Sequence, residues 1–126
     1  MAEIKVSGFS SAALDYKIVY FDNQTNPTAA IQENVTGSPG RWFSITIDNK
    51  SGDKVYARLA DASAPTLATT PSDWTFWVKA NTVYKFEVPG GAPFSEGLNL
   101  WTTLNEAPLD NNPPAANGCT VTVVCS

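Results

Sequence analysis

Short runs of alternating apolar and polar residues, separated by clusters of Gly, Pro, Asn and Asp, recur along the whole chain. Alternation places apolar side chains on one side of an extended backbone, and the turn residues between runs end each strand. No long window has apolar residues at the i, i+3, i+4 and i+7 spacing of an amphipathic helix. The pattern therefore predicts an all-β fold.

About nine runs have this strand pattern, at the spacing typical of a sandwich or barrel. They span residues 3–6, 15–21, 30–35, 41–48, 54–60, 74–79, 82–88, 98–104 and 119–125. The length of 126 residues is that of one domain. We expect a single antiparallel β-sandwich over residues 1–126, jelly-roll-like, with about eight to nine strands.

Alternation also predicts which side chains face the core. In the run 41–48, Phe43, Ile45 and Ile47 are expected inside, and Trp42 on the opposite face. In the run 74–79, Trp74 and Phe76 share one face while Trp77 lies on the other, so this strand is apolar on both sides.

The connections are predicted from their turn residues. Residues 49–53 are expected to join two strands as a β-hairpin. The Ala-, Ser- and Pro-rich segment 61–73 is expected to cross from one sheet to the other. The Pro89-Gly90-Gly91 sequence is expected to be a turn that ends the run 82–88.

The chain contains no histidine. Histidine is the base in most nucleophilic triads and a ligand in most zinc sites, so both kinds of site are disfavoured. The carboxylates lie mainly in turns and strand ends, without the spacing of a calcium loop, and no glycine-rich phosphate loop is present. We expect no enzymatic activity, no catalytic residue, no metal site and no cofactor.

The charge balance argues against nucleic acid as a partner. Eight Lys and Arg residues against twelve Asp and Glu residues give a net charge of −4 and a pI near 4.5, the opposite of a phosphate-binding surface. No apolar run approaches the roughly 20 residues that span a bilayer, and no signal-peptide pattern is present at the N-terminus. We expect synthesis in the cytoplasm of a cell and no membrane partner.

Two cysteines lie six residues apart in a β-branched run, Cys119 and Cys125. In an extended strand they are about 20 Å apart, too far for a disulfide within the chain. They are expected either to be reduced apolar side chains or to meet across a two-fold axis, where the same strand from two subunits forms a seam.

Aromatic residues are the remaining functional signal. Most of them are expected to be core residues and cross-strand pairs. Trp or Tyr at a surface is typical of a protein interface or a sugar-binding platform. The candidate partner-contact residues are Trp42, Tyr56, Trp74 and Trp77.

Residues 41–126 resemble a group of small virion proteins of tailed bacteriophages. The resemblance consists of turn and strand patterns: Asn49, Gly52, Val55-Tyr56, Leu59, Ala62-Ser63-Ala64-Pro65-Thr66, Pro89-Gly90-Gly91, Phe94-Ser95, Gly97-Leu98, Trp101-Thr102-Thr103 and the closing strand Cys119–Cys125. It implies a β-sandwich similar to the decoration, or cement, proteins that dock on the outside of an icosahedral shell. Residues 1–40 match less well, and they are expected to include an N-terminal arm or strands exchanged between subunits.

The resemblance implies a structural protein on the outer capsid surface that bridges neighbouring copies of the major capsid protein. Self-association as a dimer or trimer is expected. The alternatives are a receptor- or glycan-binding module of a tail or fibre, and a non-virion β domain whose aromatic residues are simply core.

Overall fold

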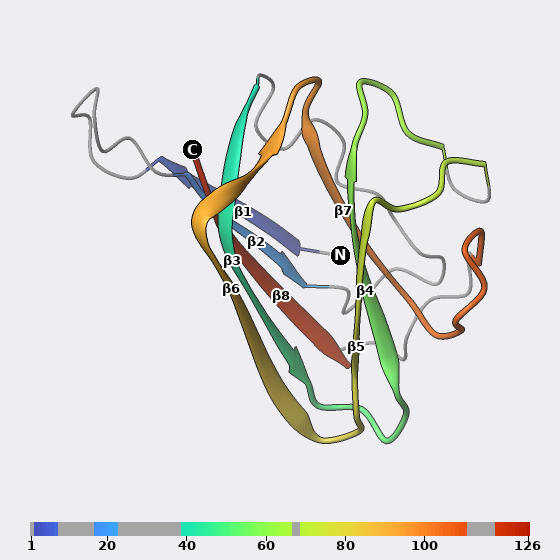
Figure 1. Cartoon of the computed structure of the whole chain (residues 1–126). Helices are drawn as coiled ribbons and strands as arrows, with labels where there is room; N and C mark the ends of the chain where they lie inside the picture. The colour runs from blue at the N-terminus through green and yellow to red at the C-terminus, as the bar shows by residue number, and fades with distance from the viewer. Residues whose placement is uncertain (1, 8–16, 23–38, 67–68, 111–117) are drawn as a thin grey trace.

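The structure is a computed structural model that describes residues 2–7, 17–22, 39–66, 69–110 and 118–126. The regular elements in these ranges are all strands, arranged in two antiparallel sheets (Figure 1). The strands are β1 (Ala2–Ser7), β2 (Lys17–Asp22), β3 (Gly40–Asn49), β4 (Val55–Asp61), β5 (Trp74–Val78), β6 (Thr82–Phe94), β7 (Leu98–Thr103) and β8 (Cys119–Cys125). The expected run 30–35 lies outside the described residues.

Sheet A has five strands in the order β1-β2-β8-β3-β6, and sheet B has three in the order β5-β4-β7. The chain crosses between the sheets four times, from β3 to β4, β5 to β6, β6 to β7 and β7 to β8 (Figure 1). As a result β3 pairs with β8 in one sheet while β4 pairs with β7 in the other. The two consecutive strands β3 and β4 thus pair with the two consecutive strands β8 and β7, one pair in each sheet, which is a jelly-roll-like arrangement. The predicted all-β antiparallel sandwich is confirmed.

The three predicted connections are all wrong. The hairpin predicted over residues 49–53 does not form, because β3 and β4 lie in different sheets. The buried side-chain amide of Asn49 holds this corner by donating to the backbone carbonyl oxygens of Asp53, Val78 and Lys79 at 2.8, 3.1 and 3.0 Å. The segment after β4 does not cross between sheets, since β4 and β5 pair with each other in sheet B.

A β-bulge in β3 reverses the predicted facing of its first half. Trp42 pairs with Cys125 and Ser44 with Val124, so Phe43 is an extra residue relative to β8. The extra residue shifts the alternation by one position. Trp42 is fully buried together with Ile45 and Ile47, and Phe43 is only partly buried. The expectation that Trp42 lies opposite the core is therefore wrong.

The Pro89-Gly90-Gly91 sequence lies inside β6 and does not end it. Four residues, 88–91, lie opposite Phe43 alone, because the pairing of β3 with β6 shifts between Trp42 and Ser44. Gly91 has a φ of 82°, and a Cβ there would lie 2.8 Å from the Arg41 Cβ. The Arg41 guanidinium donates to the Gly91 carbonyl at 3.2 Å. The glycine thus allows the two strands to stay together past the irregular stretch.

The core fills the space between the two sheets. It contains the inward side chains of both, namely Trp42, Ile45, Ile47, Val55, Ala57, Leu59, Val78, Ala92, Phe94, Leu98, Leu100, Cys119, Val121, Val123 and Cys125. Along β8 the burial alternates strictly, with Val121 and Val123 inside.

The strand that contains the cysteines is internal. β8 lies between β2 and β3 and pairs with both. A seam between two copies of β8 would need one of its edges to be open, so the predicted subunit seam at Cys119 and Cys125 is wrong. Both side chains are buried and neither forms a disulfide.

We expect both thiols to resist alkylation in the native protein and to react at once in concentrated denaturant, because burial denies the reagent access. Mass spectrometry after a short pulse of alkylating reagent measures this. A covalent dimer of native protein on a non-reducing gel would contradict the internal position of β8.

Candidate interaction surface

The four predicted contact residues lie in different environments. Trp42 is fully buried, and Tyr56 is 7% exposed. Trp74 points inward from β5 and is partly buried against the core. Trp77 points to the other side of β5 and is 54% exposed. Surface contact is therefore excluded by burial for Trp42, whereas Trp77 is open to a partner.

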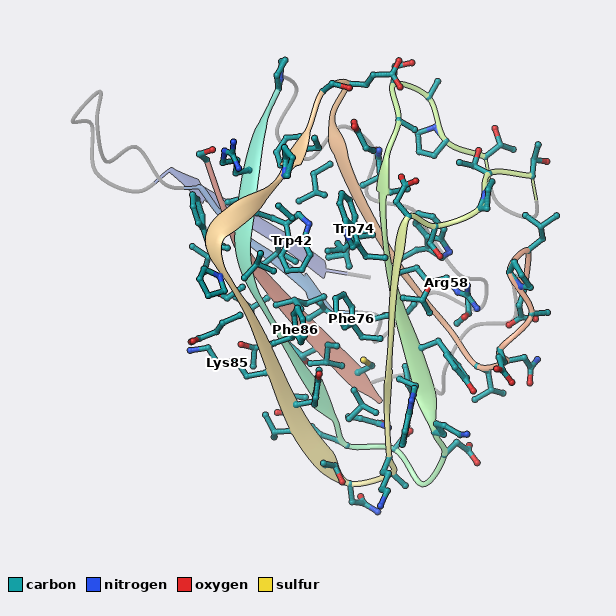
Figure 2. The ribbon with its side chains drawn as sticks, viewed as in Figure 1. Trp42, Arg58, Trp74, Phe76, Lys85 and Phe86 are labelled. Carbon is teal, nitrogen blue, oxygen red and sulfur yellow. The ribbon has the colours of Figure 1, made fainter. Side chains whose placement is uncertain are left out.

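Trp42 and Trp74 belong to an aromatic cluster that closes one side of the sandwich. The rings of Trp74 and Phe76 meet the Trp42 ring edge to face, with centroids 5.6 and 5.9 Å apart. Phe86 of β6 lies 5.2 Å from Phe76, and Figure 2 shows these rings pointing toward one another from the two sheets. Edge-to-face contacts of this kind stabilise a core beyond the area they bury.

The cluster reaches the surface along two edge strands. β5 ends sheet B and β6 ends sheet A on the same side of the molecule (Figure 1). We call this side, formed by residues 74–79 and 82–88, the β5–β6 rim. Between the two strands lies a groove of about 380 Å³, lined by residues 75–79, Thr82 and Tyr84.

Exposed apolar side chains concentrate on this rim. Of the five large hydrophobic side chains that are exposed in the described residues, the rim contains four: Trp77, Val83, Tyr84 and Phe86. The fifth, Leu109, lies in the segment between β7 and β8. Trp77 and Tyr84 both line the groove, whereas Val83 lies on the opposite face of β6 from Tyr84 and Phe86. Scattered apolar residues are ordinary at a protein surface, whereas apolar side chains gathered at one groove mark an interaction site.

The three β6 residues were not among the predicted contacts. Alternation in 82–88 places Val83 on the face opposite Tyr84 and Phe86, so whichever face of this strand points outward carries an apolar side chain. The sequence does not say which strand is at the edge. That information comes only from the strand order.

Trp77 is held by neighbours on the outer face of sheet B. It pairs across the strands with Tyr56, and the Lys54 ammonium lies 5.3 Å from the Trp77 ring and 5.8 Å from the Tyr56 ring. A cation over an aromatic ring is attracted by the ring's negative face. These contacts restrict the Trp77 side chain, which lowers the entropy that it loses when a partner covers it.

A buried arginine shapes the same face further along β4. The Arg58 guanidinium donates to the Thr103 hydroxyl at 2.9 Å and to the backbone carbonyl oxygens of three consecutive residues, 105–107, at 3.0 to 3.1 Å. Burial lowers the pKa of Arg58, and the charge of Asp110 opposes that shift. Arg58 thus fixes the start of the β7–β8 connection against sheet B.

Asp61 organises the turn between β6 and β7. Its carboxylate accepts hydrogen bonds from the backbone N–H groups of Ser95, Glu96 and Gly97 at 2.8, 2.8 and 3.2 Å. Burial opposes its ionisation, but these hydrogen bonds outweigh burial and lower the pKa of Asp61 below its ordinary value of 3.8. Its charged form stabilises the crossing from sheet A to sheet B.

We expect Asp61→Ala to lower the free energy of unfolding by roughly 1–2 kcal/mol at neutral pH. Because the folded-state pKa is lowered, the stabilisation is complete above pH 3.8 and is lost as the pH falls through the folded-state value. Urea unfolding at several pH values measures the difference. The exposed Glu106 provides the control, since Glu106→Gln removes a charge without removing these hydrogen bonds.

Two further features are absent from the ranges that the structure covers. Those residues include no group of three or more Cys, Asp or Glu side chains that could hold a metal ion. They also include no helix long and apolar enough to cross a membrane.

No protein-family model matches the chain, and no curated protein matches its sequence. Among solved structures, the chain is similar to the coat protein of Tobacco streak virus, at 12% sequence identity and a TM-score of 0.45. The alignment covers 98% of this chain and 85% of the coat protein. A likeness of this degree identifies neither a family nor a function.

Proposed function

We propose that this protein is a structural component of a virus particle, a decoration protein that lies on the outer capsid surface and binds the major capsid protein. It acts through Trp77, on the β5 side of the β5–β6 rim, and has no enzymatic activity. Such a role requires a rigid domain and a contact surface, and many weak contacts on one shell add to a stable attachment.

The observation that supports the proposal best is the concentration of exposed apolar side chains on the rim. Four of the five large exposed hydrophobic residues in the described ranges lie there. Trp77, at 54% exposure, is an aromatic anchor of the type that dominates protein interfaces. The resemblance of residues 41–126 to phage decoration proteins is consistent with this surface.

A sugar-binding module of a tail or fibre is the second candidate. It needs aromatic faces that are open on the surface, and of the four tryptophans only Trp77 is largely exposed, while Trp42 and Trp101 are buried. Lys54 already lies over the Trp77 ring. The rim is therefore better suited to a protein partner than to sugar stacking.

We expect Trp77→Ala to weaken binding to purified capsid shells by about tenfold or more while leaving the thermal midpoint nearly unchanged, because an exposed side chain contributes little to folding. Binding is measured by co-sedimentation. Leu109→Ala, which removes another exposed apolar side chain away from the rim, is the matched control and should bind normally.

Trp42→Ala shows how much stability is lost when a core tryptophan, and not a contact residue, is truncated. Truncation of this fully buried side chain should destabilise the protein by about 3–5 kcal/mol. If Trp77→Ala caused a similar loss of stability with no loss of shell binding, Trp77 would not be the contact residue.

The copy number of this polypeptide relative to the major capsid protein in purified particles tests the role itself. Hundreds of copies in a simple ratio to the shell protein are expected of a decoration protein. A handful of copies would indicate a tail location and favour sugar binding, and none would contradict a virion role. Quantitative mass spectrometry of purified particles provides this ratio.

A further inference from the structure

The outer edge of β6 is open in the described residues, where β6 ends sheet A and pairs only with β3. An open edge presents unpaired backbone N–H and carbonyl groups to any strand that can align with them. From Thr82 to Glu87 the strand pairs regularly with β3, so this part of the edge is straight.

Side chains on this edge have two distinct faces. Tyr84 and Phe86 point to the aromatic cluster side, and Lys85 and Glu87 point to the outer face of sheet A, where they form an ion pair at 3.1 Å. Figure 2 shows Lys85 directed away from the cluster. Both charged side chains are more than half exposed, at 57% and 67%.

We propose that two copies of this chain associate through β6, antiparallel, about a two-fold axis that is perpendicular to sheet A and passes beside Phe86. Sheet A of one copy then continues into sheet A of the other. The argument rests on charge complementarity in one register and on the apolar side chains that this register covers.

A perpendicular two-fold axis keeps outer faces with outer faces, so only registers that oppose residues of like face are possible. With the axis beside Phe86, Lys85 lies opposite Glu87 of the partner subunit, and Glu87 lies opposite the partner's Lys85. A shift of the axis to Lys85 places two lysines opposite each other, and a shift to Glu87 places two glutamates opposite each other. Opposed like charges destabilise a strand pair, so the register beside Phe86 is favoured.

The same register covers exposed apolar surface. Phe86, 39% exposed, lies opposite the partner's Phe86, and Tyr84, 37% exposed, lies opposite Val88 of the partner subunit. Pairing ends after Val88, because the next residue, Pro89, has no N–H to donate and the backbone there is irregular. The contact is therefore a short strand pair with an apolar inner face and a charged outer face.

This association adds a property that the proposed function needs but does not itself provide. A single chain has one Trp77, whereas a two-fold pair has two Trp77 side chains on separate copies and can bridge two shell proteins. Self-association is measured on the isolated chain, without shell protein. A negative result is therefore distinguishable from a failure of the proposed function, which is measured by shell binding.

Sedimentation equilibrium of the full chain from roughly 1 µM to roughly 1 mM tests the proposal. The expected mass at high concentration is twice the chain mass of 13.5 kDa. Lys85→Glu and Glu87→Lys each place like charges opposite each other at both symmetric contacts, and each should raise the dimer dissociation constant by about tenfold or more.

The double variant with Lys85→Glu and Glu87→Lys restores unlike charges in the same register, so it should restore the dissociation constant to near that of the natural chain. Lys50→Glu breaks another exposed ion pair, with Asp48, away from the β6 edge and is the matched control. Thermal midpoints confirm that each variant is folded.

A natural chain that stays monomeric over the whole range overturns the proposal, and it would leave the charges on β6 as a device that keeps an open edge from pairing. A dimer that is insensitive to both single variants, or that is not restored in the double variant, also overturns it, because the contact would then lie elsewhere. A mass above that of a dimer overturns the closed two-fold arrangement.

Discussion

The packing of this protein depends on the single extra residue in β3. Phe43 interrupts the alternation, and the interruption turns Trp42 inward, where its ring becomes the centre of the aromatic cluster with Trp74 and Phe76. Without the bulge, Trp42 would point to solvent and the space between β3 and β5 would lose its largest side chain. The same irregular stretch requires glycine at position 91, where the backbone has a positive φ and lies against Arg41. The packing of Trp42 in the core and the backbone conformation of Gly91 therefore both depend on the same irregular stretch of β3 and β6.

Among the strands that the structure describes, the order leaves the β5–β6 rim as an open side of the sandwich. β3 and β4 are covered by neighbours on both sides within their sheets, and β5 and β6 are not. The aromatic cluster therefore extends from the buried Trp42 to Phe86, which is part core and part surface. On the outer face of sheet B, Lys54 and Tyr56 hold Trp77 in place. The rim thus combines a rigid backing with an exposed apolar surface, the combination from which both the proposed shell contact and the proposed strand pairing follow.

Part of this arrangement was predictable from local pattern. The two faces of the run around Trp77 were correctly separated. The position of Trp42 was not predictable, because a bulge has no distinct sequence signal. One extra residue moves each side chain that precedes it in the strand to the opposite face of the sheet. The supposed hairpin after β3 failed for a different reason. The chain does turn after β3. At this turn, however, the Asn49 side-chain amide donates hydrogen bonds to the carbonyl oxygens of Val78 and Lys79 at the end of β5, and the chain continues into the other sheet.

The sequence by itself determined the class of fold and the absence of histidine chemistry, because period-two alternation and residue composition are local properties that no tertiary contact can alter. The tertiary structure alone decided which strands are internal and which lie at an edge. That order placed Cys119 and Cys125 inside sheet A and left Trp77 and Phe86 at the rim. Similar β-branched and aromatic runs form both kinds of strand, so exposure follows from long-range pairing and not from any single run.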